Sequence, residues 1–178
     1  MIRTRIAGIF VFSVVAVAIL AGQSVQPAKP GPDHQKLAAF VGKWNTEGES
    51  FVSPYGPAGK ITAVDTYAWL PGNFFLDHKF DGKQGTLAFS GTEILGYDAA
   101  AKAYVTHVFD NFGNTGTSKG TAKGNIYSFT ADTVVAGKPL KERGTVTVAK
   151  DTITSKWEYS SDGMKWLPNF EVKLTRAK

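Results

Sequence analysis

Four side chains in the middle of this 178-residue sequence form two combinations that could carry acid–base chemistry. Asp65 and His78 stand in one pair of neighbouring extended runs, and Glu93 and His107 stand in the next pair. With loops of four or five residues between the runs, Asp65 faces His78 and Glu93 faces His107, about 5 Å apart at Cβ. A histidine oriented by a carboxylate is the base half of many hydrolytic sites, so these four residues are the catalytic candidates.

The same residues also have a structural interpretation, which we favour. No Ser or Thr stands in a nucleophile-elbow context, and a buried histidine satisfied by a neighbouring acid would give the same pattern. In this register His78 and His107 are separated by about 13 Å along the intervening strand, too far to share a metal ion. His34 lies beside the Pro-rich N-terminal segment, with nothing predicted around it. The sequence contains no cysteine, which excludes thiol chemistry, and it predicts neither a metal site nor a cofactor.

The elements that must position these side chains are strands. After Gly42, runs rich in β-branched and aromatic residues are interrupted every eight to twelve residues by turn-forming residues, which leaves about ten strands. No spacer is long enough for a crossover helix, so the strands are antiparallel. Closing the sheet removes its two edges and leaves an interior that can hold one small ligand. We therefore predict an all-β, up-and-down barrel with one short helix over 33–41, capped by Asp33.

Alternation along each run predicts which side chains point into the barrel. In 104–110 both faces are acceptable, and we take the face that carries His107 as the interior one. The predicted ligand-binding residues are Tyr67, Trp69, Leu76, His78, Phe89, Glu93, Leu95, His107 and Phe109.

The N-terminus has the layout of a secretory signal peptide. Residues 1–24 combine a short basic start with an uncharged apolar stretch and small residues at the cleavage position, although an uncleaved anchor is the alternative. Gln23 occupies the position that a lipidated cysteine would need, so the protein is not expected to be a lipoprotein. Residues 25–32 are Pro-rich and predict a tether, and 33–178 form one domain. The expected location is periplasmic or secreted, with no membrane span after cleavage.

The charge balance argues against a nucleic-acid partner. The whole sequence carries a formal charge of +5, and removing Arg3 and Arg5 with the leader lowers it to +3. The remaining lysines are scattered singly, without the basic run or basic helix that nucleic-acid binding needs.

Three short motifs carry a resemblance to known proteins. The segment 37–44 (LAAFVGKW) resembles the opening of lipocalin-type (calycin) barrels, and 70–75 (LPGNFF) and 95–104 (LGYD followed by KAY) resemble a bacterial exported family, domain of unknown function 1579. The likeness runs from about Leu37 to Leu174. It implies a calycin-like barrel with no established activity, in which Gly42 and Trp44 are structural, Trp44 closes the floor and Arg176 covers it. Some such barrels bind haem through a late-strand histidine, but 152–178 contain none.

These observations favour a binding module. We expect an exported barrel that holds a small apolar or amphipathic molecule, with His78 and Glu93 as polar anchors. Two alternatives stay open: an acid–base enzyme that uses a carboxylate–histidine pair inside the barrel, and an envelope interaction protein with a filled barrel. The oligomeric state is not predicted.

Overall fold

The computed structural model describes residues 28–178, so the predicted signal peptide and the first part of the tether lie outside the described residues. The chain forms a short helix, a single 3₁₀ turn and ten strands. In chain order they are α1 (Pro32–Lys36), η1 (Leu37–Ala39), β1 (Gly42–Ser50), β2 (Gly59–Trp69), β3 (Phe75–Gln84), β4 (Leu87–Asp98), β5 (Ala103–Asp110), β6 (Thr115–Lys123), β7 (Ile126–Val135), β8 (Lys138–Val148), β9 (Thr152–Ser160) and β10 (Leu167–Arg176).

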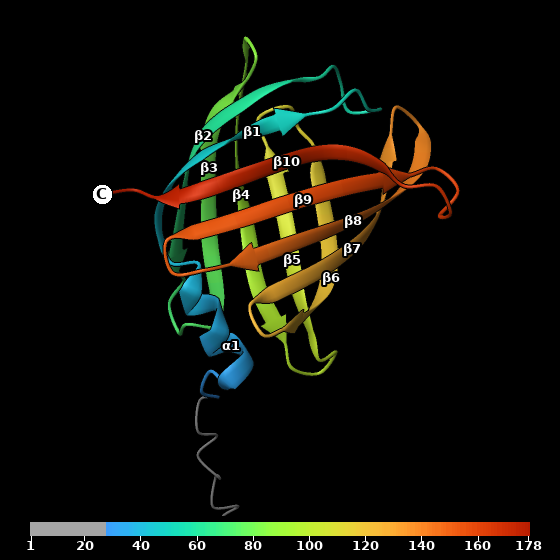
Figure 1. Ribbon diagram of the computed structural model, residues 1–178. Helices are drawn as coiled ribbons and strands as arrows, with labels where there is room; N and C mark the ends of the chain where they lie inside the picture. Colours follow the sequence, from blue (N-terminus) through green and yellow to red (C-terminus); the bar gives the residue numbers. More distant parts are fainter. Residues whose placement is uncertain (1–27) are drawn as a thin grey trace, which may run out of the picture.

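The ten strands form one closed antiparallel barrel in which each strand pairs with its neighbours in sequence and β1 also pairs with β10 (Figure 1). This confirms the predicted up-and-down barrel and its short N-terminal helix. The helix begins one residue earlier than predicted, with Gly31 rather than Asp33 as its N-cap, and it is shorter because a 3₁₀ turn replaces its second half. Within residues 28–178, no helix is both long enough and apolar enough to cross a membrane.

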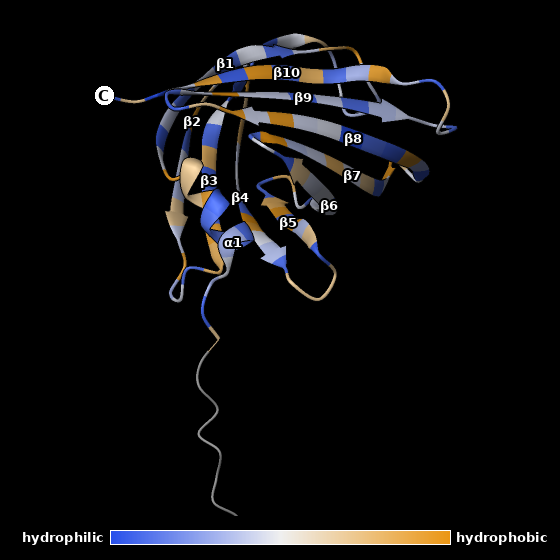
Figure 2. Ribbon diagram, turned by 60° about the horizontal axis from the view of Figure 1, so that its bottom comes forward, coloured by the Kyte–Doolittle hydropathy of each residue, from blue (hydrophilic) through white to orange (hydrophobic). Residues whose placement is uncertain are grey.

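Apolar and polar residues alternate along the strands, as Figure 2 shows, because successive side chains point to opposite sides of the sheet. The inward rings need space, and glycines on neighbouring strands supply it. The ring of Phe80 lies against Gly91, and the indole of Trp157 lies against Gly144. A side chain at either glycine would collide with the ring, so these two positions let large aromatic residues lie flat against the barrel wall.

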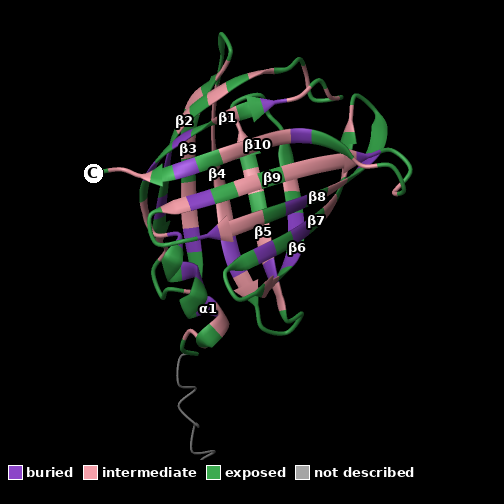
Figure 3. Ribbon diagram, in the orientation of Figure 1, coloured by how far each residue is buried: buried purple, intermediate pink, exposed green. Residues whose placement is uncertain are grey.

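The two ends of the barrel differ in packing. At the end covered by α1 and η1, Leu37, Trp44 and Leu76 have no solvent exposure, and Phe40 has 3%. Figure 3 shows that the buried positions of β3 and β4 lie toward this end. At the opposite end inward residues such as Phe80, Phe89 and Phe170 are only half-buried, although Ser50 and Leu140 are buried there. Trp157 and Val172, also half-buried, pack against the core from this side. The barrel therefore has a packed floor and an upper half, called the open half below, in which inward aromatic residues stay partly exposed.

The predicted registers need correction, although the faces of β2, β3 and β4 are as expected. Tyr67 pairs with His78 and Trp69 with Leu76, a shift of two residues caused by a longer loop after Trp69. β3 continues to Gln84, which leaves a two-residue hairpin loop and pairs His78 with Glu93 instead of Phe89. A shift of an even number of residues keeps every side chain on its face.

The register between β4 and β5 is off by one residue, and this reverses a face. Tyr97 pairs with Tyr104, not with Ala103, so the predicted pairing of Glu93 with His107 is wrong. Val108 is the residue opposite Glu93. His107 and Phe109, which we predicted to line the interior, lie on the outer face of β5 and are exposed.

Candidate functional site

A carboxylate–imidazole–carboxylate cluster lies inside the barrel, at the boundary between the packed floor and the open half. The His78 ring on β3 lies between Asp65 of β2 and Glu93 of β4. Its Nε2 is 2.7 Å from Asp65 Oδ1, and its Nδ1 is 3.4 Å from Glu93 Oε1. The predicted Asp65–His78 contact is therefore present, although the two residues are diagonal neighbours, and Glu93 contacts His78 instead of His107.

Two further residues, Thr46 and Tyr67, also contact this cluster. These contacts were not predicted from the sequence. Thr46 of β1 donates its hydroxyl to the second oxygen of Asp65. The Tyr67 ring stacks on the His78 ring, with centroids 3.8 Å apart and planes 7° from parallel. Thr46 lies two residues after Trp44, so strand alternation places it on the inward face. This alternation is the sequence feature from which its position could have been predicted.

The geometry defines the charge of His78. A neutral imidazole has one N–H, so it could satisfy only one of the two carboxylates and would present a lone pair to the other. Burial opposes the charged ring, but the hydrogen bonds to Asp65 and Glu93 and their negative charges outweigh it, and they raise the pKa of His78 from 6.5 to about 9. At neutral pH the cluster is a clamped imidazolium between two carboxylates, with a net charge of −1.

This arrangement does not support the predicted base chemistry. An imidazolium that donates from both nitrogens has no lone pair with which to accept a proton. Burial and the negative charges of Glu93 and Asp65 raise the pKa of Tyr67 well above its usual value, so its phenol stays neutral. The cluster can orient a ligand and accept hydrogen bonds, because Glu93 remains about a quarter exposed toward the interior.

Of the nine predicted ligand-binding residues, His107 and Phe109 lie on the outer face, and the other seven divide between the two halves of the barrel. Tyr67, Leu76 and Leu95 are buried in the floor, where Trp69 packs against the same core. His78, Glu93 and Phe89 border the open half. The residues that line this half without having been predicted include Phe80, Val108, Trp157, Phe170 and Val172.

The floor has the arrangement that the resemblance implied for Trp44 and Arg176. The Trp44 indole donates to Phe40 O at 2.8 Å, and the Arg176 guanidinium lies 4.1 Å from the centre of its ring. Arg176 also donates to Val41 O at 3.0 Å.

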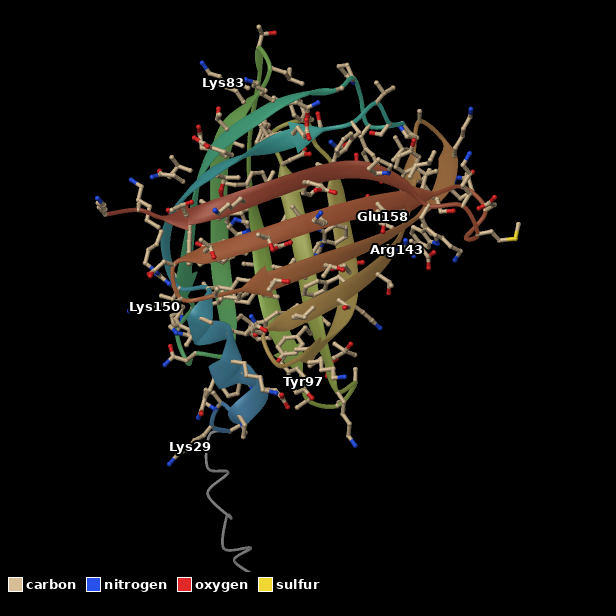
Figure 4. The ribbon with its side chains drawn as sticks, in the orientation of Figure 1. Lys29, Lys83, Tyr97, Arg143, Lys150 and Glu158 are labelled. Atoms are coloured by element: carbon tan, nitrogen blue, oxygen red, sulfur yellow. The ribbon has the colours of Figure 1, made fainter. Side chains whose placement is uncertain are left out.

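His34, for which no neighbours were predicted, is buried and contacts the rings of Phe74 and Tyr97 edge-on. Tyr97 lies beside α1 (Figure 4).

The mouth is partly covered by the segment 51–58 between β1 and β2. Gln84 Nε2 donates to Pro57 O at 2.8 Å, and Ser53 donates its hydroxyl to Asn169 Oδ1 at 3.0 Å. Tyr55 reaches Glu142 of β8 on the far side of the opening, where burial raises the pKa of Glu142 and the hydrogen bond from Tyr55 lowers it. The segment therefore crosses the rim, and Glu142 of β8 is a third inward carboxyl group besides Asp65 and Glu93.

A side opening lies between β6 and β7. Their ladder stops at Lys119 and Thr130, although β6 begins at Thr115 and β7 continues to Val135. A cleft of about 760 Å³ occupies this region. Its lining includes inward residues such as Gly116 and Thr133 together with outward ones. The wall of the barrel is thus interrupted on this side, next to the cleft.

No metal centre is visible in the described part of the chain. Among residues 28–178, no group of three or more His, Asp or Glu side chains is arranged to hold a metal ion.

Together these features define a closed ten-stranded barrel with a packed floor and an interior charged cluster. The chain belongs to the family "Protein of unknown function (DUF1579)", whose model matches residues 29–176. It is also similar to the crystal structure of Rv2717c from M. tuberculosis, with 13% sequence identity, a TM-score of 0.61, and coverage of 83% of this chain and 99% of that chain. At this identity the likeness shows the fold alone. No curated protein matches the sequence.

Proposed function

We propose that this barrel binds one small apolar or amphipathic molecule in its open half, with His78 and Glu93 as the polar anchor. The observation that carries the proposal is the contrast in burial between the two ends. Leu76 is fully buried at the floor, whereas Phe80 and Phe89 stay partly exposed inside the upper half. Small-molecule sites have this form, a concave apolar wall with a few convergent polar groups.

The arrangement of the aromatic residues in the open half is compatible with an amphipathic ligand. The centroids of His78 and Phe80 are 5.6 Å apart, and those of Phe80 and Phe89 are 6.1 Å apart, so a line of rings leads from the cluster toward the mouth. On the other side, Trp157 stacks with Phe170 at 6.4 Å. An apolar body can lie between these walls while a polar end reaches Glu93.

We also propose that the protein is exported. The signal-peptide pattern of residues 1–24 supports a periplasmic or secreted location, in which the barrel would meet its ligand outside the cytoplasm. Signal cleavage is checked by measuring the mass of the protein purified from its own cells.

Binding is tested with Nile red, an uncharged apolar dye whose fluorescence rises in apolar surroundings. We expect saturable binding of one dye per barrel. Val108→Trp places an indole into the space opposite Glu93 and should reduce dye affinity at least about tenfold, the equivalent of about 1.4 kcal/mol.

The matched control is Val64→Trp, because Val64 lies on the outer face of β2 with 39% exposure and does not line the side cleft. It should bind the dye as the unmodified protein does. Absence of saturable dye binding, or equal loss in both variants, would contradict a ligand site in the open half.

A further inference from the structure

We infer that the ligand of this barrel carries a positively charged, hydrogen-bond-donating group, such as a primary ammonium, which binds Glu93 beneath the aromatic wall. This inference rests on the proposed function and specifies its ligand class. It depends on the distribution of charge between the inside and the outside of the barrel.

The inside of the barrel is acidic, although the chain as a whole is basic. Asp65, Glu93 and Glu142 occupy inward positions, and the His78 imidazolium compensates only one of them. The Lys and Arg residues of the ten strands lie on the outer face, except Lys138 at the rim and Arg176 at the floor. Arg143, labelled in Figure 4, is one of the outer residues, and its Nε pairs with Glu158 Oε2 at 2.6 Å.

Among the imidazole nitrogens and carboxylate oxygens of the cluster, Glu93 Oε2 is the one atom without a hydrogen-bond partner within the described residues. His78 uses one nitrogen for each carboxylate, and Asp65 has both oxygens engaged, one by His78 and one by Thr46. Glu93 contacts His78 through Oε1 only, and within the described residues its Oε2 accepts no hydrogen bond. A carboxylate oxygen is an acceptor, so the remaining position calls for a donor on the ligand.

The sign of the charge follows from the same geometry. A ligand carboxylate at this position would face Glu93, and like charges at short distance repel. Among the described strands the inward Lys138 and Arg176 lie at the rim and at the floor, away from Glu93. An ammonium would form a charge-assisted hydrogen bond with Glu93 and bring the cluster to neutrality. Phe80 lies next to the cluster, with Phe89 beyond it, and aromatic faces also attract cations.

Three probes with the same eight-carbon chain test this inference by calorimetric titration at pH 7: octylamine, octanol and octanoate. We expect octylamine to bind at least about tenfold more tightly than octanol, and octanoate to bind more weakly than octanol. Glu93→Gln should reduce the preference for octylamine over octanol to about twofold or less. Glu47→Gln, the same change at an exposed position on the outer face of β1, should preserve it.

A second pair of variants covers the case in which Glu93→Gln does not fold. Val108→Lys places an ammonium group of the chain itself opposite Glu93, so it should remove the preference for octylamine, whereas the uncharged Val108→Met should keep it.

The results separate this inference from the proposed function. Octanol or Nile red binding without any preference for octylamine, or with a preference for octanoate, overturns the cationic ligand class and leaves the binding function standing. A preference that survives both Glu93→Gln and Val108→Lys overturns it as well. If neither the three probes nor Nile red bind, the proposed function and this inference fail together.

Discussion

The floor and the open half of this barrel are built from the same ten strands, yet they are packed in opposite ways. At the floor, α1 and η1 supply Leu37 and Phe40, which fill the end of the barrel against Trp44 and Leu76. At the mouth, none of the residues 28–178 forms a helix, and inward rings such as Phe89 remain partly exposed. Dense packing at the floor stabilises the closed sheet, and the other end, where inward rings stay partly exposed, is where we propose that a ligand binds.

Truncation at the two ends should separate these roles most clearly. Trp44→Ala removes a fully buried indole and its hydrogen bond to Phe40 O, so we expect a loss of about 3–5 kcal/mol in the free energy of unfolding. Trp157→Ala removes the same side chain from the open half, where it is partly exposed, and should cost about half as much. Urea denaturation measures both, and equal losses would remove the contrast between floor and mouth.

The charged cluster at the boundary between the halves should make stability depend on pH. The pKa of His78 is about 9 in the folded protein and 6.5 when unperturbed. Because the folded value is the higher one, the stabilisation is complete below pH 6.5 and is lost as the pH rises through 9. The loss should reach about 3 kcal/mol across this window, measured by urea denaturation at a series of pH values.

The groups that face His78 are Asp65, Glu93 and the stacked Tyr67, so the variant His78→Gln should abolish the loss of stability above pH 6.5. His107→Gln is the matched control. Its ring lies on the outer face and hydrogen-bonds the Thr115 hydroxyl at 3.0 Å, and its removal should leave the loss unchanged. A pH profile that is the same with and without His78 would contradict the clamped imidazolium.

The sequence was sufficient to predict the fold and part of the site. Period-2 alternation placed Asp65, His78 and Glu93 on one interior face correctly, because loop-length errors of two or four residues do not change a face. The β4–β5 turn was different. Lys102 adopts a positive φ of 52° there, and the turn is one residue shorter than assumed, which exchanges the faces of His107 and Val108.

The contacts across the barrel could not be predicted in the same way. The stacking of Tyr67 on His78 depends on the exact register of β2 and β3. The approach of Tyr55 to Glu142 depends on how the loop 51–58 crosses the mouth. Neither is specified by local residue patterns, because both are set by strand stagger around the whole barrel.

The smallest expected difference between the two ends concerns their arginine–tryptophan pairs. At the floor, the Arg176 guanidinium lies 4.1 Å from the centre of the Trp44 ring, is held by Val41 O and has a side-chain exposure of 35%. On the outer face, Arg143 lies 4.4 Å from the centre of the Trp166 ring with 47% exposure. Cation–π attraction grows as water is excluded, and ion pairs at exposed sites contribute little.

Arg176→Met keeps most of the side-chain stem and removes the charge and its hydrogen bonds, so it should cost about 1–2 kcal/mol in the free energy of unfolding. Arg143→Met should cost about 0.5 kcal/mol, even though it also breaks the ion pair with Glu158. Both are measured by urea denaturation at two salt concentrations. The Arg143 effect should shrink at high salt while the Arg176 effect persists, because screening acts on the exposed pair more strongly than on the guanidinium held at the floor. A larger loss at Arg143 than at Arg176 would show that the charge above Trp44 is not what secures the packed end of the barrel.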